Sequence, residues 1–221
     1  MGIITGYITL VLLLLLLLKF VAKRLKWERI NRALMRSHKY FALAFLIFAL
    51  LHFFLVLKVL EGRMLIVTIS GIIILVVGIA LTVLCHTIKR RDLENKIHRF
   101  FSLIMAIFAM VHIIMYFIDF QNYEEKIDEI EISEIDLKTI EDGQYIGEYD
   151  AGYIYAQVQV TVNRHQIEDI EILKHVNERG KAAEVIVNDI IARQKIDVDV
   201  VTHATNSSNV IKQACINALM E

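Results

Sequence analysis

Residues 38–52 read HKYFALAFLIFALLH, and residues 98–112 read HRFFSLIMAIFAMVH. The two stretches are identical at seven of fifteen positions when they are aligned with an offset of 60, and each begins and ends with a histidine. This repeat predicts two similar helices, each with one histidine near either end. We therefore expect the surrounding region to consist of two helical hairpins in tandem, related by an axis along the normal of a membrane.

Apolar segments long enough to cross a bilayer contain or flank these stretches. A transmembrane helix needs about 20 apolar residues, and four segments approach that length, at 3–22, 40–57, 64–85 and 100–118. Their only charged residue is Lys19. The first segment lacks the basic start and the small-residue cleavage site of a secretory signal peptide, so we expect it to be a true span. Residues 1–118 are thus predicted to form an all-α four-helix membrane bundle.

Charged residues between and after these segments predict the orientation of the chain. Seven basic residues against Glu28 lie in the first connection, and five basic residues lie in the third. Acidic residues dominate after the fourth segment, beginning with Asp119. Because basic loops stay on the cytoplasmic side of a membrane, we expect both termini and the second loop to be extracytoplasmic. The predicted location is the cytoplasmic membrane, as a multi-pass protein.

The histidines of the repeat are candidate ligands. His38 and His52 are 14 residues apart, as are His98 and His112. In an α-helix, 14 residues return to within about 40° of the starting direction and rise about 21 Å. Each pair therefore lies on one face of its helix at two depths. We expect His38 to face His98 near the cytoplasmic side, and His52 to face His112 nearer the outside.

Ionisable residues inside membrane spans are candidates for function. Two facing imidazoles can bind a haem iron from both sides, so two levels predict two b-type haems. For any one of these residues, a hydrogen bond to a neighbouring helix is the alternative. Zinc and di-iron sites are disfavoured because no carboxylate or thiolate accompanies the histidines. His86 is interpreted as an interfacial residue, with a haem or quinone contact as the alternative.

The histidine pattern resembles the haem-binding helix pairs of ferric-reductase-like and other bis-haem membrane b-type cytochromes. The repeat that carries this resemblance covers about residues 38–118 of the membrane domain, 1–118. Lys39 and Arg99 each follow a candidate ligand, and we expect them to pair with haem propionates.

A change in composition near Asp119 predicts a second domain. Residues 119–141 are acidic and are expected to form a helical or extended linker, followed by a small α+β domain over 142–221. Alternating apolar residues and turn signals predict strands at 143–149, 155–162 and 167–173. Helical spacing predicts helices at 178–194 and 208–219, and Ser207 or Ser208 is the expected N-cap of the last one. The two cysteines, Cys85 and Cys215, are expected to be free thiols.

Hydroxyl and amide side chains before the last predicted helix are candidates for phosphate binding, because a helix N-terminus binds anions. A run of serine and threonine that only caps the helix is the alternative. The residues that decide between the two are Asp142-Gly143-x-Tyr145-x-Gly147, Leu173-Lys174-His175, Arg179-Gly180-x-Ala182-Ala183-Glu184, and Gln194-x4-Asp199-x-Val201-Thr202-x-Ala204-Thr205-Asn206-Ser207-Ser208.

In this order the motifs resemble the covalent FMN-binding domain family over residues 142–220. The resemblance implies FMN joined through its phosphate to Thr205, and a flavin transferase that makes the bond outside the cytoplasmic membrane. The expected cofactor-binding residues are Thr205, Asp199, Thr202, Ala204, Asn206, Ser207 and Ser208. His203 departs from the family, which most often has glycine there, and a positive φ at that position would disfavour histidine.

The combined prediction is an electron-transfer flavocytochrome. It is an enzyme in itself only if the FMN reduces a substrate directly. Electrons enter from the cytoplasmic side or from membrane quinol, pass the His38/His98 haem and the His52/His112 haem, and reach FMN on Thr205 and then an external acceptor. The alternatives are a membrane-anchored flavodomain whose helices are only a scaffold, and an extracytoplasmic reductase of ferric ion or a small molecule. No glycine-rich nucleotide motif points to NAD(P)H as donor, and no basic domain points to nucleic acid.

Overall fold

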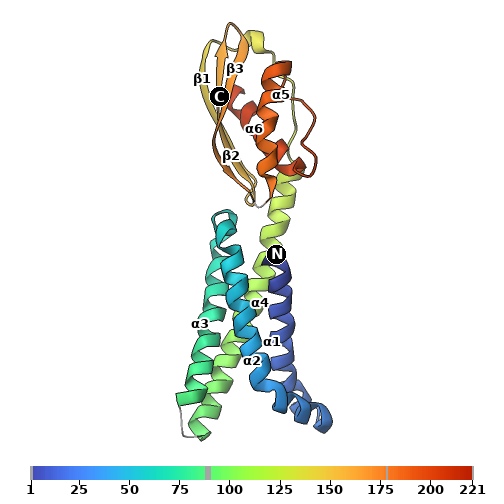
Figure 1. The fold of residues 1–221 in the computed structure, drawn as a ribbon, viewed down its shortest axis with the longest axis vertical. Coiled ribbons are helices and arrows are strands. Elements are labelled where there is room, and N and C mark those ends of the chain that lie inside the picture. Colours follow the sequence, from blue (N-terminus) through green and yellow to red (C-terminus); the bar gives the residue numbers. More distant parts are fainter. Residues whose placement is uncertain (1, 88–90, 178, 221) are drawn as a thin grey trace. The chain divides into compact units, whose positions relative to one another are not determined.

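The computed structural model describes residues 2–87, 91–177 and 179–220. The chain divides into two compact units, one of Met1–Lys58 with Leu65–Met115 and the other of Val59–Met64 with Tyr116–Glu221. The first unit is helical, and the second contains a three-stranded sheet with helices (Figure 1).

Four long helices correspond to the four predicted spans. They are α1 (Gly2–Arg24), α2 (Glu28–Val56), α3 (Leu65–Thr87) and α4 (Arg91–Asp128), and each is long and apolar enough to cross a membrane. Many of their large apolar side chains are exposed, which is the surface that lipid requires. Together these features indicate a membrane protein. The helices exceed the predicted spans because their polar ends are helical too.

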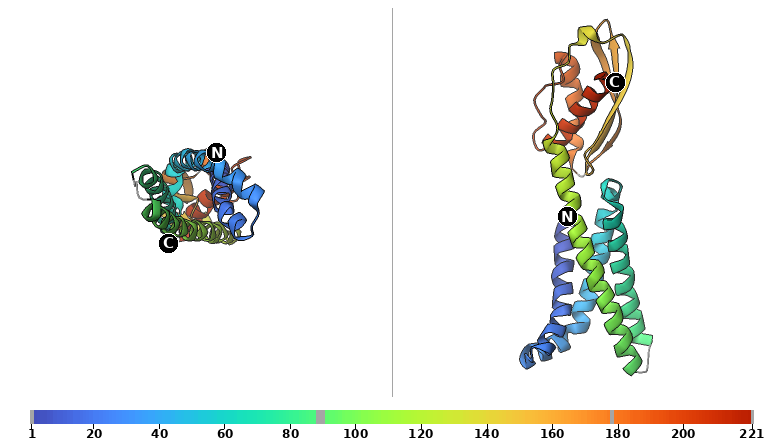
Figure 2. Two further views of the ribbon diagram at one scale, coloured as in Figure 1. Left: turned by 90° about the horizontal axis from the view of Figure 1, so that it is seen from below. Right: turned by 180° about the vertical axis from the view of Figure 1, so that it is seen from behind.

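The helices of the first unit run alongside one another (Figures 1 and 2). Glycines mark the contacts in which side chains approach the backbone: Gly6 of α1 lies against His52 of α2, and Gly71 of α3 lies against His112 of α4. The interior is apolar, with a cluster that draws on all four helices and consists of Leu13, Phe45, Val77, Leu81, Met105 and Ala109.

Burial follows the sequence repeat. Along residues 37–50 and 97–110, the order of buried, half-buried and exposed side chains is the same at every position with an offset of 60. The two histidine-bearing helices therefore present equivalent faces to the interior of the unit.

The second unit contains an antiparallel meander in the order β1 (Gly143–Asp150), β2 (Tyr155–Asn163) and β3 (Gln166–Val176). The predicted alternation in the second strand is confirmed, because its inward side chains are buried: Ala156, Val158, Val160 and Val162. Helices α5 (Ile186–Arg193) and α6 (Thr205–Met220) lie over one face of the sheet (Figure 1). Gly147 of β1 is required there, because a Cβ atom would lie 2.2 Å from the backbone nitrogen of Ala218 in α6.

Three details differ from the sequence prediction. Residues 179–194 do not form one α-helix, because the 3₁₀ helix η3 (Gly180–Val185) precedes α5, and the predicted first residue of that helix, 178, lies outside the described residues. The last helix starts at Thr205, and the expected caps Ser207 and Ser208 are buried inside it. Residues 119–141 are more than a linker, because isoleucines spaced along them pack on the core of the second unit: Ile127, Ile130, Ile132, Ile135 and Ile140.

Candidate functional site

The histidines at the C-terminal ends of the repeat, His52 and His112, are held by the neighbouring helices. The Nδ1 atom of His52 lies 2.9 Å from the carbonyl oxygen of Gly2 and 3.5 Å from the hydroxyl oxygen of Thr5, both in α1. The Nδ1 atom of His112 lies 3.0 Å from the carbonyl oxygen of Val67 and 3.1 Å from the hydroxyl oxygen of Ser70, both in α3.

These contacts determine the tautomer of each imidazole. A backbone carbonyl can only accept a hydrogen bond, so Nδ1 of His52 and of His112 must carry the proton and donate it. In the neutral ring Nε2 then holds the lone pair that a metal ion binds. Metal-binding histidines usually have their second nitrogen fixed in this way by a carbonyl or carboxylate. In both residues Nε2 is therefore the nitrogen that could bind a metal ion.

The supporting residues repeat as the histidines do. In α1 the carbonyl, hydroxyl and glycine come from Gly2, Thr5 and Gly6, and in α3 they come from Val67, Ser70 and Gly71. The spacing is the same in both helices, a hydroxyl three residues after the carbonyl and a glycine next to it. A Cβ atom on Gly6 or Gly71 would lie 3.0 or 3.1 Å from the imidazole Cε1 atom. The glycines thus allow the rings to approach the neighbouring helix.

The other predicted pair, His38 and His98, meets between α2 and α4. Their ring centroids are 6.0 Å apart, with the rings inclined at 78°. The two rings are therefore in edge-to-face contact. The structure therefore brings together the two residues predicted to share one level.

Small side chains flank the histidines on the interior faces. Ala49 and Ala109 are buried three residues before His52 and His112. Midway between the two histidine levels lie Phe45 and Met105, which are 2% and 6% exposed. The faces thus combine small side chains near His52 and His112 with apolar side chains midway between the two histidine levels.

The donor set fits haem better than a bare metal ion. Among the described residues, no group of three or more histidine, cysteine, aspartate or glutamate side chains is placed to hold a metal ion. A haem needs only two axial ligands from the protein, because the macrocycle supplies the others. The remaining membrane predictions stay predictions: Lys39 lies over the ring of Tyr40, and the side chain of His86 is outside the described residues.

In the second unit, the predicted attachment residue Thr205 is exposed at the first residue of α6. The loop before it is tied to the helix by backbone and side-chain bonds. The N–H of Val201 donates to the hydroxyl of Ser208 at 3.1 Å, and the N–H of Ala204 donates to the carbonyl of Val201 at 3.0 Å. The hydroxyl of Ser208 is therefore used within the protein, which explains why it does not cap the helix.

A buried lysine that the sequence interpretation missed also ties this loop. Lys212 of α6 is 3% exposed, and its ammonium group donates to the carbonyl of Val198 at 2.8 Å. The carboxylate of Asp197 lies 3.6 Å away. A lysine is rarely buried unless it is paired. The two contacts of Lys212 therefore fix the loop before Thr205 to α6.

His203 adopts a left-handed backbone conformation, with φ of 65°. This region favours glycine, which is the residue most often found there in the family named above. The turn that presents Thr205 therefore has the positive φ considered in the sequence interpretation, and histidine adopts it.

The predicted flavin residues fall into two groups. Thr202, Thr205, Asn206 and Asp199 are exposed, and the carboxylate of Asp199 pairs with Arg193 at 3.6 Å. The others are buried: Ala204, Ser207 and Ser208. The exposed group can reach a ligand, whereas the buried group shapes the turn.

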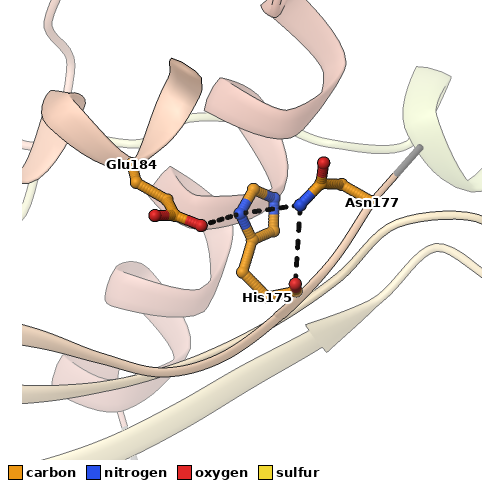
Figure 3. Close-up of polar contacts among 3 residues, drawn as sticks. All are labelled: His175, Asn177 and Glu184. Carbon is orange, nitrogen blue, oxygen red and sulfur yellow. Dashed lines mark hydrogen bonds and ion pairs between the residues drawn. The ribbon is translucent and has the colours of Figure 1, made fainter. Parts of the chain in front are cut away.

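A buried histidine lies near the start of α6, and the sequence interpretation quoted it without giving it a role. Figure 3 shows the imidazole of His175 between Glu184 and Asn177. Its Nδ1 atom is 3.0 Å from the carboxylate of Glu184 and 3.3 Å from the amide nitrogen of Asn177. Glu184 belongs to η3, and a Cβ atom on Gly180 of η3 would collide with the hydroxyl of Ser207. The pair thus joins η3 to the end of β3, and the glycine at position 180 allows η3 to approach the first turn of α6.

Residues 152–220 match the family model of the FMN-binding domain. None of the curated proteins and none of the solved structures matches the chain. The matched range contains the Thr205 turn, α6 and the His175–Glu184 pair. It supports FMN as a cofactor of this segment and flavin-based electron transfer as its chemistry.

Proposed function

We propose that the protein is a membrane flavocytochrome in which two b-type haems and one covalently bound FMN carry electrons across the membrane. His38 with His98, and His52 with His112, would bind the haem irons. Thr205 would carry FMN through its phosphate after modification by a flavin transferase outside the cytoplasm.

The observation that carries the haem proposal is the matched support of His52 and His112. A histidine that only joined two helices would need one hydrogen bond, and either nitrogen would serve. Here both rings use Nδ1, both bond a carbonyl, and both leave Nε2 as the ligand nitrogen. Haem b supplies the one-electron chemistry when it is bound, and the chain supplies ligands, spacing and an apolar layer.

The flavin proposal is supported by the match to the FMN-binding domain family and by the position of Thr205. The positive end of the dipole of α6 lies at its first residue and stabilises a phosphate there. The side chain of Thr205 is exposed, so a transferase can reach its hydroxyl oxygen. The turn that precedes it is held by Ser208 and Lys212.

The proposed direction of electron flow follows from the charged loops. Because basic loops stay on the cytoplasmic side, the His38/His98 level would lie there, where membrane quinol or a cytoplasmic donor would supply electrons. The His52/His112 level would pass them to FMN, and an extracytoplasmic acceptor would receive them.

A reduced-minus-oxidised spectrum of the purified protein tests the proposal, with haem and flavin quantified per chain. We expect two b-type haems and one flavin that stays attached after denaturation. Loss of either His52 or His112 should remove one haem and leave the other, whereas unchanged haem content would refute the pairing. A flavin-loaded protein without haem bands would instead be the membrane-anchored flavodomain. Turnover of ferric ion or a small molecule without partners would identify a terminal reductase.

A further inference from the structure

Aromatic side chains form a stacked group in the second unit, and none of them was singled out in the sequence. The rings of Tyr123 and Tyr153 are parallel to within 13°, with centroids 4.9 Å apart. Phe120 lies 6.2 Å from the first ring and 6.1 Å from the second. We call Phe120, Tyr123 and Tyr153 the aromatic stack.

The guanidinium group of Arg63 covers one end of the aromatic stack. Its central carbon lies 3.3 Å from the centre of the Tyr153 ring, which is close contact for a cation on an aromatic face. Tyr153 is thus enclosed between Arg63 on one face and Tyr123 on the other. Arg63 lies in the segment Val59–Met64, which belongs to the same compact unit as the three rings.

The stack is held by short, well-defined connections. Tyr153 lies in the turn between β1 and β2, where the N–H of Gly152 donates to Asp150 at 2.8 Å and the N–H of Ala151 donates to the carbonyl of Ile154 at 2.9 Å. A Cβ atom on Gly62 would lie 2.6 Å from the carbonyl oxygen of Gly152. Glycine at position 62 therefore allows the segment that carries Arg63 to approach this turn.

The position of Tyr123 is also fixed by the end of α4. One turn later on this helix, the ammonium group of Lys126 donates to the carbonyl of Asp150 at 2.9 Å. The backbone carbonyl of Lys126 accepts from the hydroxyl of Tyr149 at 2.7 Å. These bonds connect α4 to the corner between β1 and β2. These bonds hold Tyr123 of the helix next to Tyr153 of the turn.

The other end of the stack leads to the candidate flavin site. The side-chain amide of Asn206 donates to the hydroxyl of Tyr123 at 2.7 Å. Asn206 directly follows Thr205 and is exposed, whereas Tyr123 is half-buried. The hydroxyl end of the Tyr123 side chain therefore lies beside Asn206, the neighbour of the residue proposed to carry FMN, and Tyr123 is partly accessible.

We infer that the aromatic stack is the surface on which the isoalloxazine ring packs when FMN is attached to Thr205, an inference that rests on the proposed function. The ribityl phosphate arm separates the flavin ring from its point of attachment. The surface that binds the ring must therefore lie at a distance from the Thr205 hydroxyl. Flat aromatic rings stack on one another favourably. Tyr123 is the contacting ring, and Tyr153 and Arg63 are positioning residues behind it.

The test measures the flavin fluorescence decay of the full-length protein, because a tyrosine in contact with an oxidised flavin quenches its emission. The variant Tyr123→Leu should lengthen the decay several-fold, whereas Tyr123→Trp should keep it short because tryptophan retains the flat, electron-rich ring. Tyr155→Leu is the matched control, since Tyr155 contacts Glu148 and not the stack. Haem per chain is measured in each protein, so that differences in energy transfer to haem are excluded.

Covalent flavin is counted separately on denaturing gels. If the wild-type chain carries no covalent flavin, the proposed function is refuted, independently of the aromatic stack. If flavin is attached and the decay of Tyr123→Leu equals that of the wild type, the isoalloxazine ring does not pack on the aromatic stack. Arg63→Leu should also lengthen the decay, and Arg63→Lys should lengthen it less, because lysine keeps the charge but not the planar contact with Tyr153. An unchanged decay in Arg63→Leu would remove Arg63 from the arrangement.

Discussion

The Nδ1 atom of His112 lies 3.0 Å from the carbonyl oxygen of Val67, one helix away. This distance assigns the proton of the neutral imidazole to Nδ1 and the lone pair to Nε2. The same relationship joins His52 to Gly2. Two residues of the repeat thus share a tautomer, and each tautomer is fixed by a backbone atom that mutation of a side chain does not remove.

The hydroxyls of Ser70 and Thr5 lie beside these bonds. They should adjust the affinity of the two histidines for a metal ion, whereas the backbone carbonyls hold the rings in place. Removal of a group that supports a metal ligand typically lowers affinity by about 10- to 100-fold. If His52 and His112 share a haem as proposed, we expect Ser70→Ala to weaken its binding without abolishing it, because the carbonyl of Val67 still fixes the ring of His112. Haem titration of the apoprotein measures the affinity, and a redox titration shows which haem has shifted.

Thr87 provides the control for that experiment. It lies in α3 as Ser70 does, and its hydroxyl donates to the carbonyl of Val83 within the helix. Thr87→Ala should therefore leave the binding of both proposed haems unchanged. Equal weakening in Ser70→Ala and Thr87→Ala would show that α3 acts only through general packing.

Replacement of Thr205 tests the flavin attachment directly. Thr205→Ala should abolish the flavin fluorescence of the denatured protein band, because alanine has no hydroxyl oxygen to form the phosphoester. Thr139→Ala is the matched control, since Thr139 is also an exposed threonine of the second unit but lies outside this loop. Loss of flavin from Thr202→Ala together with its retention in Thr205→Ala would move the attachment to residue 202.

The four long apolar helices and the three strands were predictable because they depend on local periodicity. The membrane helices follow from uninterrupted apolar runs, and β2 follows from strict alternation. The support of His52 by Gly2 was not predictable, because it joins residues 50 positions apart and uses a backbone atom. The start of α6 was misplaced because Ser207 and Ser208 look like caps, whereas the hydroxyl of Ser208 bonds the preceding loop.

The segment 119–141 shows a second limit of the sequence. Its acidic residues predicted a linker, and its isoleucines were too widely spaced to predict a core. They gain their role only through the sheet and α6, which supply the rest of that core. Tyr123 lies in the same region, and no local pattern shows that it meets Tyr153 of a turn 30 residues later.

Cys215 gives a pH-dependent test of the core of the second unit. Complete burial raises the pKa of its thiol from 9.0 to about 12. The thiolate is the reactive species, so the raised pKa leaves far less thiolate at neutral pH than an exposed cysteine would have. In a Cys85→Ser background, a thiol reagent should label Cys215 only when the unit opens. Rapid labelling of the folded protein at pH 8 would contradict the burial.

The raised pKa of the Cys215 thiol also determines how the free energy of unfolding of the second unit changes with pH. Below pH 9 the thiol is protonated in both the folded and the unfolded state, so its contribution is constant. Between pH 9 and about 12 the unfolded thiol ionises while the folded thiol stays protonated, which favours the unfolded state. The free energy of unfolding should therefore fall across this window, and it should fall less in Cys215→Ala. Parallel pH profiles for the two proteins would show that the thiol makes no contribution.

His203 allows the turn before Thr205 to be tested through its backbone. A left-handed conformation costs a residue with a Cβ atom about 1–2 kcal/mol, and glycine avoids this cost but loses about 0.5–1 kcal/mol in chain entropy. His203→Gly should therefore raise the free energy of unfolding of the second unit by about 0.5–1 kcal/mol. Labelling of Cys215 through the open state measures that free energy. His203→Ala keeps the Cβ atom and removes the imidazole, so it should give no gain. An equal gain in both variants would assign the effect to the imidazole and not to the φ of 65°.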